Sequence, residues 1–389
     1  MNDMLQRTIR IAGRRWLGAL ALAALVFGCG GVGTGGTGSF AVGPISGFGS
    51  IIVNGVRFDD VDASVESDDG NPRSSASLRL GMMVEVDADE VRNAQAAASR
   101  VRVVSELIGR VDAVDPSLGQ LVVNGLTVRT NASTVFDDQF AGGLSGIAVA
   151  SVIEVFGFVD GAAGAVLATR LEPRAGASSF KFRGALSALD RAARTFQIGN
   201  QLFSYAGLSP EPQGLANEAI VRVVVGTTRD GAGRWEVMAL AGGVPSRDGV
   251  EGEADGLISA YTSAADFRVN GLPVDASAAV VQGGPLAAGQ RVEVHGRLLA
   301  GVLIASTVSV KREEGNGEFE LHGIVDSVDP ASQTLRLRDR SELISIARPG
   351  LKYEDGTAAD LLPGRRVEVK GMLSADGTRV EATEIEFED

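Results

Sequence analysis

The sequence predicts an all-β fold, built as a tandem array of about five small, five-stranded antiparallel modules. The first observation behind this is a hairpin signature, in which Asn-Gly stands between two apolar, β-branched runs. Asn and Gly both tolerate positive φ, so the pair favours a two-residue type I′ turn. The signature occurs at Asn54-Gly55, at Asn124-Gly125 and at Asn270-Gly271.

The second observation is a recurring strand in which apolar and polar residues alternate, as expected for a half-buried strand. Successive copies lie roughly 70 residues apart, a spacing typical of arrays of modules. Composition agrees, because 51 glycines and an aromatic content of 5% favour turn-rich β structure over helix. The copies occupy residues 81–86, 152–157, 221–226, 292–296 and 367–371.

Each module is predicted to contain five strands, with a loop or short helix between the third and the fourth. This order is typical of a small, partly open barrel of the oligonucleotide/oligosaccharide-binding (OB) type. An immunoglobulin-like sandwich is the alternative, but it needs about seven strands. The short joints between modules predict an elongated or curved string in which sequence neighbours pack together. The predicted modules are 44–106, 107–174, 178–245, 250–312 and 316–389.

The N-terminus predicts export. Residues 1–28 combine basic residues ending at Arg14-Arg15 with the apolar stretch 16–27, which is too short to span a bilayer. Residues 26–29 resemble the lipobox of bacterial lipoproteins, which implies cleavage before Cys29 and a diacylglycerol on its sulfur. The alternative is a secreted protein with one unmodified thiol. Because Cys29 is the single cysteine, no intramolecular disulfide can form.

The segment 29–43 is predicted to be a lipidated cysteine followed by a glycine-rich tether, because ten residues after the cysteine have little to bury. Gly30 resembles the residue that follows the cysteine in outer-membrane lipoproteins. The predicted location is therefore the cell envelope, where a lipid on Cys29 would attach the protein to the membrane. Export by the general route or by a twin-arginine route both fit the basic segment.

These features together resemble a bacterial lipoprotein family, domain of unknown function 5666. The resemblance rests on residues 49–58 after a lipobox, on Gly81-x-x-Val84-Glu85-Val86, and on an apolar closing strand in each module. The first, second and fourth modules fit best. The third has Gly199-Asn200 in the place of the Asn-Gly turn, and the fifth has Arg338-Asp339. The resemblance implies no activity and no catalytic residue.

The chain carries a formal charge of −13, which argues against nucleic acid as a partner. Only two histidines are present, His295 and His322, so a Ser-His-Asp triad or a multi-histidine metal site has little to draw on. Their module positions hold very different side chains elsewhere, so both are predicted to be structural surface residues. The glutamates of the fourth strands form a solvated face in one interpretation and glycosidase-type carboxylate pairs in the other. They are Glu85, Glu154, Glu293 and Glu368.

The sequence offers candidate residues for two types of ligand. Acidic loops offer oxygen ligands for calcium, although none has the spacing of an EF-hand and solvated turns explain them equally; the candidates are Asp59, Asp60, Asp62, Asp68 and Asp69. Aromatic rings offer a platform for sugars, but they do not recur at one module position; they are Phe48, Phe58, Tyr205, Trp235, Tyr261 and Tyr353. We therefore expect no cofactor and no catalytic residue.

The predicted function is a non-enzymatic, envelope-anchored binding or scaffold protein whose ligand is a glycan or a protein. Repetition favours this function, since an array multiplies weak contacts through effective concentration. The alternatives are an envelope hydrolase with a carboxylate pair between modules, and a purely structural spacer.

Overall fold

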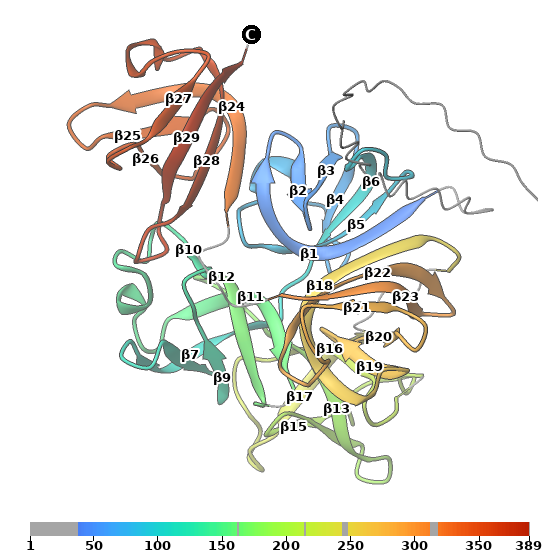
Figure 1. Ribbon diagram of the computed structural model, residues 1–389. Helices are drawn as coiled ribbons and strands as arrows, with labels where there is room; N and C mark the ends of the chain where they lie inside the picture. Colours follow the sequence, from blue (N-terminus) through green and yellow to red (C-terminus); the bar gives the residue numbers. More distant parts are fainter. Residues whose placement is uncertain (1–37, 162, 214, 243–247, 312–317, 389) are drawn as a thin grey trace, which may run out of the picture. The chain divides into compact units, whose positions relative to one another are not determined.

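The computed structural model describes residues 38–388, apart from 162, 214, 243–247 and 312–317. The predicted signal peptide, Cys29 and most of the glycine-rich segment lie outside the described residues. The described part consists of strands β1 to β29 and three short 3₁₀ helices, as predicted for an all-β chain (Figure 1). Its residues include no helix of the length and apolarity that crossing a membrane requires.

Module 2 shows how the strands of a module pair. Its five main strands are β7 (Leu107–Asp115), β8 (Gln120–Val123), β9 (Leu126–Arg129), β11 (Val152–Asp160) and β12 (Ala165–Pro173). β7 pairs with β8 and β8 with β9, all antiparallel; β9 then pairs in parallel with β12. β12 pairs with β11, and β11 returns to β7. These pairings form a closed ring, so the module is a barrel. The alternative prediction of an immunoglobulin-like sandwich is wrong.

The other modules repeat this order of pairing, with the third strand parallel to the closing strand. In module 1 the strands are β1 (Ser39–Phe48), β2 (Ile51–Val53), β3 (Val56–Asp59), β5 (Met83–Ala88) and β6 (Gln95–Val103). In module 3 they are β13 (Phe180–Asp190), β14 (Thr195–Ile198), β15 (Gln201–Ser204), β16 (Ile220–Val225) and β17 (Trp235–Gly242).

In module 4 the corresponding strands are β18 (Glu251–Ser263), β19 (Asp266–Val269), β20 (Leu272–Asp275), β22 (Arg291–Leu299) and β23 (Val302–Val310). In module 5 they are β24 (Phe319–Asp329), β25 (Thr334–Leu337), β26 (Ile344–Ser345), β28 (Arg366–Leu373) and β29 (Val380–Glu388). β1 begins at Ser39, earlier than the predicted start of module 1 at residue 44.

The connection between the third and the fourth strand holds short elements, partly as predicted. Modules 1, 2 and 5 each have a 3₁₀ helix there, at Ser75–Ser77, Gly143–Gly146 and Ala358–Asp360. Four modules also have a short strand that lies parallel to the closing strand and extends the barrel wall. These strands, which the sequence did not predict, are β4 (Ser64–Ser67), β10 (Val135–Phe136), β21 (Val280–Gln282) and β27 (Lys352–Glu354).

The Asn-Gly turns adopt the predicted backbone conformation. Both residues of each pair have positive φ, for example 54° at Asn54 and 79° at Gly55. The strands on either side pair in register, with Val53 opposite Val56. The hairpin prediction is therefore confirmed for all three signatures, at Asn54-Gly55, Asn124-Gly125 and Asn270-Gly271.

The glycine that follows the alternating residues of the fourth strand is explained by a β-bulge. At Gly296 the register between β22 and β23 shifts, and a Cβ atom here would lie 2.1 Å from the carbonyl oxygen of Ile304. Backbone cannot yield as a flexible side chain does. In module 3 the glycine of the same motif, Gly226, faces open space.

We therefore expect Gly296→Ala to lower the free energy of unfolding by about 1 to 3 kcal/mol, the usual cost of overpacking. Gly226→Ala is the matched control, and we expect little change from it. Urea denaturation of both variants measures the difference. Equal stability of the two variants would contradict the explanation by the bulge.

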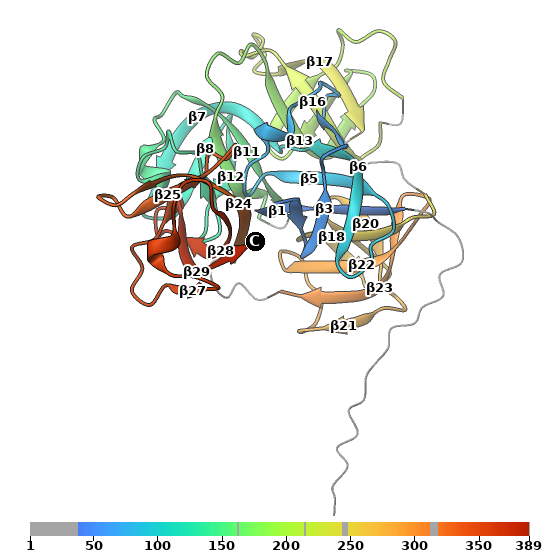
Figure 2. The same cartoon turned by 90° about the horizontal axis from the view of Figure 1, so that it is seen from above.

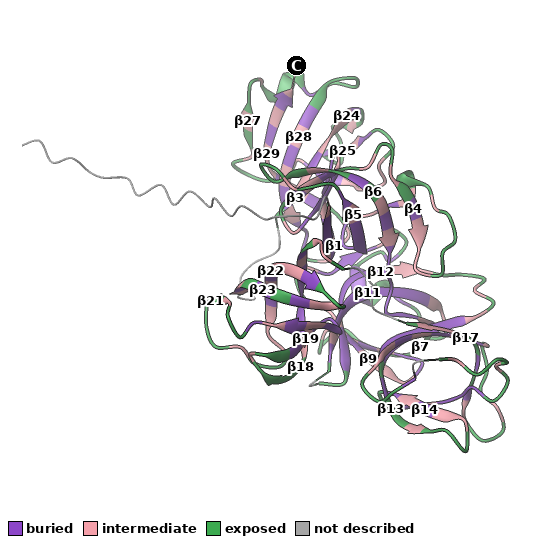
Figure 3. Cartoon of the chain, turned by 90° about the vertical axis from the view of Figure 1, so that its right-hand side faces the viewer, coloured by how far each residue is buried: buried purple, intermediate pink, exposed green. Residues whose placement is uncertain are grey.

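Buried apolar residues form the three cores of the described residues, and buried positions recur along the strands of the barrels (Figure 3). In module 4 the core includes Phe267, Val269, Val292, Val294 and Leu298, all buried. Because the side chains of a strand alternate between its two faces, Glu253, Glu293 and His295 lie on the outer face of the barrel. These three residues are on the neighbouring strands β18 and β22. Because the apolar residues between them point into the core, the three side chains lie on the same side of the sheet.

The modules are joined to one another through the edges of their first strands. The start of β1 pairs in parallel with the start of β18, with Ser39 opposite Glu251, so modules 1 and 4 share a sheet (Figure 1). The end of β1 pairs with β24 of module 5, and β7 of module 2 pairs with β13 of module 3 (Figure 2). Modules far apart in the sequence are therefore direct neighbours, a contact that the expected packing of sequence neighbours did not include. The physical reason is that the edge of a strand carries unpaired backbone N–H and C=O groups, which can form hydrogen bonds with the edge of a strand from another module.

Candidate functional site

Four outward positions on the first and the fourth strand of a module lie at the corners of a square. In module 4, Glu253 and Asp255 of β18 lie opposite His295 and Glu293 of β22. In module 5, Glu320 and His322 of β24 lie opposite Lys370 and Glu368 of β28. We call these sets the module 4 square and the module 5 square. Glu253 corresponds in position to Glu320, and Glu293 to Glu368. The histidine is on the fourth strand in module 4 and on the first strand in module 5.

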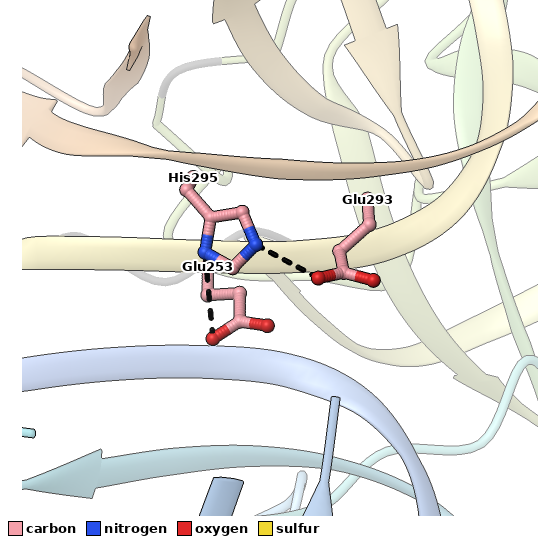
Figure 4. A group of neighbouring side chains, drawn as sticks. All are labelled: Glu253, Glu293 and His295. Atoms are coloured by element: carbon pink, nitrogen blue, oxygen red, sulfur yellow. Dashed lines mark hydrogen bonds and ion pairs between the residues drawn. The ribbon is translucent and has the colours of Figure 1, made fainter. Parts of the chain in front are cut away.

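In the module 4 square the imidazole of His295 lies between two carboxylates (Figure 4). Its Nε2 is 2.8 Å from Oε1 of Glu293, and its Nδ1 is 3.8 Å from Oε2 of Glu253. The second oxygen of Glu293 contacts the ammonium of Lys311. Asp255, the fourth corner, accepts hydrogen bonds from Arg291. Two glutamates and a histidine thus converge, while the aspartate is held apart by an arginine.

The two glutamates of this square differ in their electrostatic environment. Burial raises the pKa of Glu253 to about 7, and the charge of His295 only partly offsets that burial. The hydrogen bond from His295, together with Lys311, lowers the pKa of Glu293 to about 2. The bond to Glu293 in turn raises the pKa of His295. The side chain of Glu253 is 12% exposed, and its Oε1 is buried without a hydrogen-bond partner.

The module 5 square has a built-in cation. Nε2 of His322 lies 2.7 Å from Glu320 and 3.7 Å from Glu368, and its Nδ1 lies 2.9 Å from Glu388. The guanidinium of Arg57, which comes from module 1, contacts Glu320 and lies 3.0 Å from Nε2 of His322. Arg57 therefore supplies a positive charge directly to two corners of this square.

The prediction that His322 is a surface residue is wrong, because its side chain is only 9% exposed. Gly49 of module 1 lies against it, so close that a Cβ on the glycine would be 2.4 Å from the Cβ of His322. Joining modules 1 and 5 covers this position. His295, with a side chain 44% exposed, lies nearer the surface, as expected.

The fourth-strand glutamates of modules 1 and 2 do not form a solvated face, as one interpretation expected. Glu85 and Glu154 are buried, and both have polar partners. Glu85 lies 3.4 Å from Arg102, and Glu154 accepts a hydrogen bond of 2.6 Å from Ser105. The repeat pattern does not specify this burial, because alternation gives only the side of the strand on which a residue lies.

Module 3 carries positive charge where the other modules carry negative charge. Lys181 donates to Asp68 of module 1 at 3.0 Å, and Arg222, at the usual glutamate position, lies 3.9 Å from the same carboxylate. Arg183 donates to the fully buried Glu106, at the joint between modules 1 and 2, at 2.7 Å. The departure of module 3 from the repeat is thus explained, because its basic face packs against acidic residues of its neighbours.

The calcium candidates do not converge in this structure. Asp68 is paired with Lys181 and Arg222, and Asp69 accepts hydrogen bonds from Ser67 and Asn71 within its own loop. Asp59 and Asp62 are exposed and Asp60 is half-buried. Within the described residues, the groups of three donors close enough to hold an ion are those of the two squares, and none of these five aspartates belongs to them.

The aromatic rings considered for sugar binding are mostly inside the barrels. Phe48, Phe58, Tyr205 and Trp235 are buried, whereas Tyr261 is 39% exposed. Tyr353 is half-buried and stacks on Phe387. Four of the six rings therefore present no open face of the kind that stacks on a sugar.

A cleft of about 690 Å³ opens beside the module 4 square. One wall consists of residues of module 1, including Phe40, Phe58 and Val91, and the other of residues of module 4. Glu253 and His295 both line it. Two of the three converging residues are therefore reachable from a cavity large enough for a small ligand.

A protein-family model matches residues 42–102, 108–172, 255–309 and 322–386. The chain belongs to the family described as Domain of unknown function (DUF5666). The four DUF5666 matches correspond to modules 1, 2, 4 and 5, and module 3, with its inverted charge, is the one they leave out. The recognition from the sequence is thereby confirmed for the domain family.

Other comparisons add little to the DUF5666 assignment. No curated protein matches the chain. One solved structure, titled "drosophila Unr CSD456", is similar at 12% sequence identity over 54% of this chain and 97% of that chain, with a TM-score of 0.14. A score this low carries no argument about fold or ligand.

Sequence reasoning missed the first-strand corners of the squares, Glu253 and Glu320. A signal existed, because each glutamate stands two residues before a residue already aligned across modules, Asp255 or His322. Arg57 was not foreseeable in this role, since its contact with module 5 depends on how β1 and β24 pair.

Proposed function

We propose that the protein is an exported, lipid-anchored, non-enzymatic scaffold of the cell envelope that binds a ligand in the cleft between modules 1 and 4. The observation that carries this proposal is the pairing of first-strand edges between modules. Shared sheets hold barrels in fixed relation, and a fixed relation between modules 1 and 4 keeps a cleft preformed, as ligand sites usually are. Avidity along a flexible string is no longer needed for binding.

The cleft favours a small or narrow ligand over a broad glycan surface. Its lining combines apolar residues such as Val56 and Ile304 with the charged Glu253, His295 and Arg297. Such a mixture suits a ligand with a polar or charged group. The buried position of most aromatic rings weighs against a stacking platform for sugars.

The anchor part of the proposal rests on the N-terminal sequence. We expect the protein, expressed in a double-membraned bacterium, to incorporate radioactive palmitate, and Cys29→Ser to abolish the label, since the sulfur is the acceptor. The variant should also stay at the size of the uncleaved chain. An unlabelled, secreted parent protein would contradict the lipid anchor.

The binding part is tested by thermal melts of the purified protein with panels of envelope polysaccharides and small anionic and cationic compounds. A ligand present at about 100 times its dissociation constant adds roughly 2.7 kcal/mol to the stability of the state that binds it. We expect a stabilising compound whose effect disappears in Arg297→Ala, a residue of the cleft wall. A polysaccharide that stabilises parent and variant equally would place binding elsewhere.

A second candidate function, an envelope hydrolase, is favoured by one observation. Glu253 and Glu293 lie close together, with pKa values of about 7 and about 2. Oppositely shifted carboxylates are the usual arrangement of a general acid and its partner in glycoside hydrolysis. Turnover of an ester or polysaccharide by the parent, lost in both Glu253→Gln and Glu293→Gln, would establish this function and displace the scaffold.

A further inference from the structure

We propose that Glu253, Glu293 and His295 form a binding site for one divalent transition-metal ion such as Zn²⁺. Their ligand atoms all lie within 4.8 Å of one another, close enough to converge on one ion after small side-chain rotations. This inference deepens the proposed binding function by naming a ligand at one end of the cleft, and it is independent of the lipid anchor.

The donor set selects the class of ion. One imidazole and two carboxylates are ligands that Zn²⁺ accepts, and three protein ligands leave a fourth position open to water or to a ligand. Calcium prefers six to eight oxygen ligands, and a histidine nitrogen is not among them. Because Glu253 and His295 line the cleft, the open position would face the cleft.

The site also has an unsatisfied group that an ion would satisfy. Oε1 of Glu253 is buried and accepts no hydrogen bond from any described residue. A buried carboxylate without a partner is costly, and coordination to a cation removes that cost. In Glu293 the two oxygens have different partners. Lys311 contacts Oε2, and Oε1 faces His295.

The module 5 square provides an internal comparison. Its glutamates, Glu320 and Glu368, occupy the same corners as Glu253 and Glu293. There the guanidinium of Arg57 takes the place of a cation between Glu320 and His322. Within the described residues, no lysine or arginine forms an ion pair with Glu253, which pairs with His295. The same arrangement of acids is therefore neutralised by an arginine in module 5 and is available to a metal ion in module 4.

Binding must release protons, because a metal ion coordinates a neutral imidazole and an ionised carboxylate. The protons of His295 and of protonated Glu253 pass to solvent when the ion enters. Nothing is oxidised or reduced, and no covalent bond of the chain changes.

The test is a calorimetric titration of the purified full-length protein in detergent with Zn²⁺. Parent and variants all carry Cys29→Ser, so that the single thiol cannot act as a ligand. Two variants remove donors: Glu253→Gln, which keeps the shape of the side chain, and His295→Lys. Module 5 has Lys370 at the position of His295, so the barrel accommodates a lysine there.

We expect the parent to bind one Zn²⁺ and both variants to bind it at least about 100-fold more weakly, since loss of an outer-shell partner alone costs about 10- to 100-fold. Glu320→Gln, the matched change in module 5, should leave the affinity unaltered. No saturable binding by the parent would overturn the proposal, as would equal affinity of the parent and Glu253→Gln. A loss in Glu320→Gln as large as in Glu253→Gln would also overturn it, because the ion would then not be assigned to module 4. If His295→Lys failed to fold, Glu253→Gln alone would decide.

These outcomes are separable from those of the scaffold proposal. If Zn²⁺ binds but no compound in the panels stabilises the protein, the metal site is supported and the proposal of a ligand in the cleft is contradicted. A cleft ligand that stabilises the protein in the presence of a chelator, with no Zn²⁺ binding, would do the reverse.

Discussion

Replacing Arg183 by methionine should lower the free energy of unfolding by about 3 to 5 kcal/mol at neutral pH. The reason is that Glu106, whose side chain is fully buried, would lose the guanidinium that lies 2.7 Å away. Removing one member of a buried ion pair leaves an uncompensated charge, which costs more than the pair contributes. Arg183 also donates to the carbonyl of Asn270, so the loss affects modules 3 and 4 and the joint between modules 1 and 2 together.

The destabilisation by Arg183→Met should shrink as the pH falls. Burial already raises the pKa of Glu106 against the opposing charge of Arg183, and without Arg183 the pKa rises further. A carboxyl group whose pKa is higher in the folded state than in the unfolded state binds its proton more tightly when the protein is folded. It therefore stabilises the fold increasingly as the pH falls towards the pKa of the unfolded state. Urea denaturation at pH 5 and pH 8 measures this trend.

The matched control is the double variant Glu106→Leu with Arg183→Met, which removes both charges. Apolar replacement of a whole buried pair is often neutral, so we expect the double variant to recover most of the lost stability. A double variant less stable than Arg183→Met would show that the charge of Glu106 has another partner, and would contradict the explanation.

Glu253→Gln should have the opposite effect on stability, making the metal-free protein more stable at pH 8 by up to about 3 kcal/mol. The pKa of Glu253 is raised from 4.5 to about 7, and each pKa unit corresponds to about 1.4 kcal/mol. The folded state holds the proton between these values, so stability falls as the pH rises from 4.5 to 7. Glutamine is neutral throughout and removes this loss. At pH 5 parent and variant should be nearly equal.

The groups around Glu253 fix the sign of this prediction. Glu293 and Asp255 disfavour its charge, His295 and Lys311 favour it, and burial outweighs them. The measurement is a pair of denaturation series with chelator present, in parent and variant, from pH 5 to pH 8. A variant less stable than the parent at pH 8 would mean that the contact between Glu253 and His295 stabilises the fold and that the carboxylate is a structural partner. Residues that bind ligands commonly reduce stability in the absence of the ligand.

The sequence was informative wherever local rules decide the structure. The turns at Asn54-Gly55, Asn124-Gly125 and Asn270-Gly271 form because of backbone preferences that belong to those residues alone. The Val-Glu-Val alternation and its glycine specify the fourth strand and its bulge. Repetition then extended each local rule to the whole array.

The candidate site was less predictable, because it depends on which modules meet. Histidine positions were judged from the variety of residues at equivalent places, and this reasoning failed for His322 because module 1 covers it. The interpretation of the fourth-strand glutamates as a solvated face was wrong for Glu85 and Glu154, which are buried. Strand alternation tells which side of a barrel a residue faces, but not whether another barrel lies against that side. The pairing of β1 with β18 and β24 joins edges that carry no sequence motif.

The most direct test of the account is a crystal of the protein soaked in Zn²⁺ and measured with X-rays on either side of the zinc absorption edge. The account predicts an anomalous peak among Glu253, Glu293 and His295, and no peak at Glu320, His322 and Glu368, where Arg57 supplies the positive charge. A peak at the module 5 square, or none at the module 4 square, would contradict it.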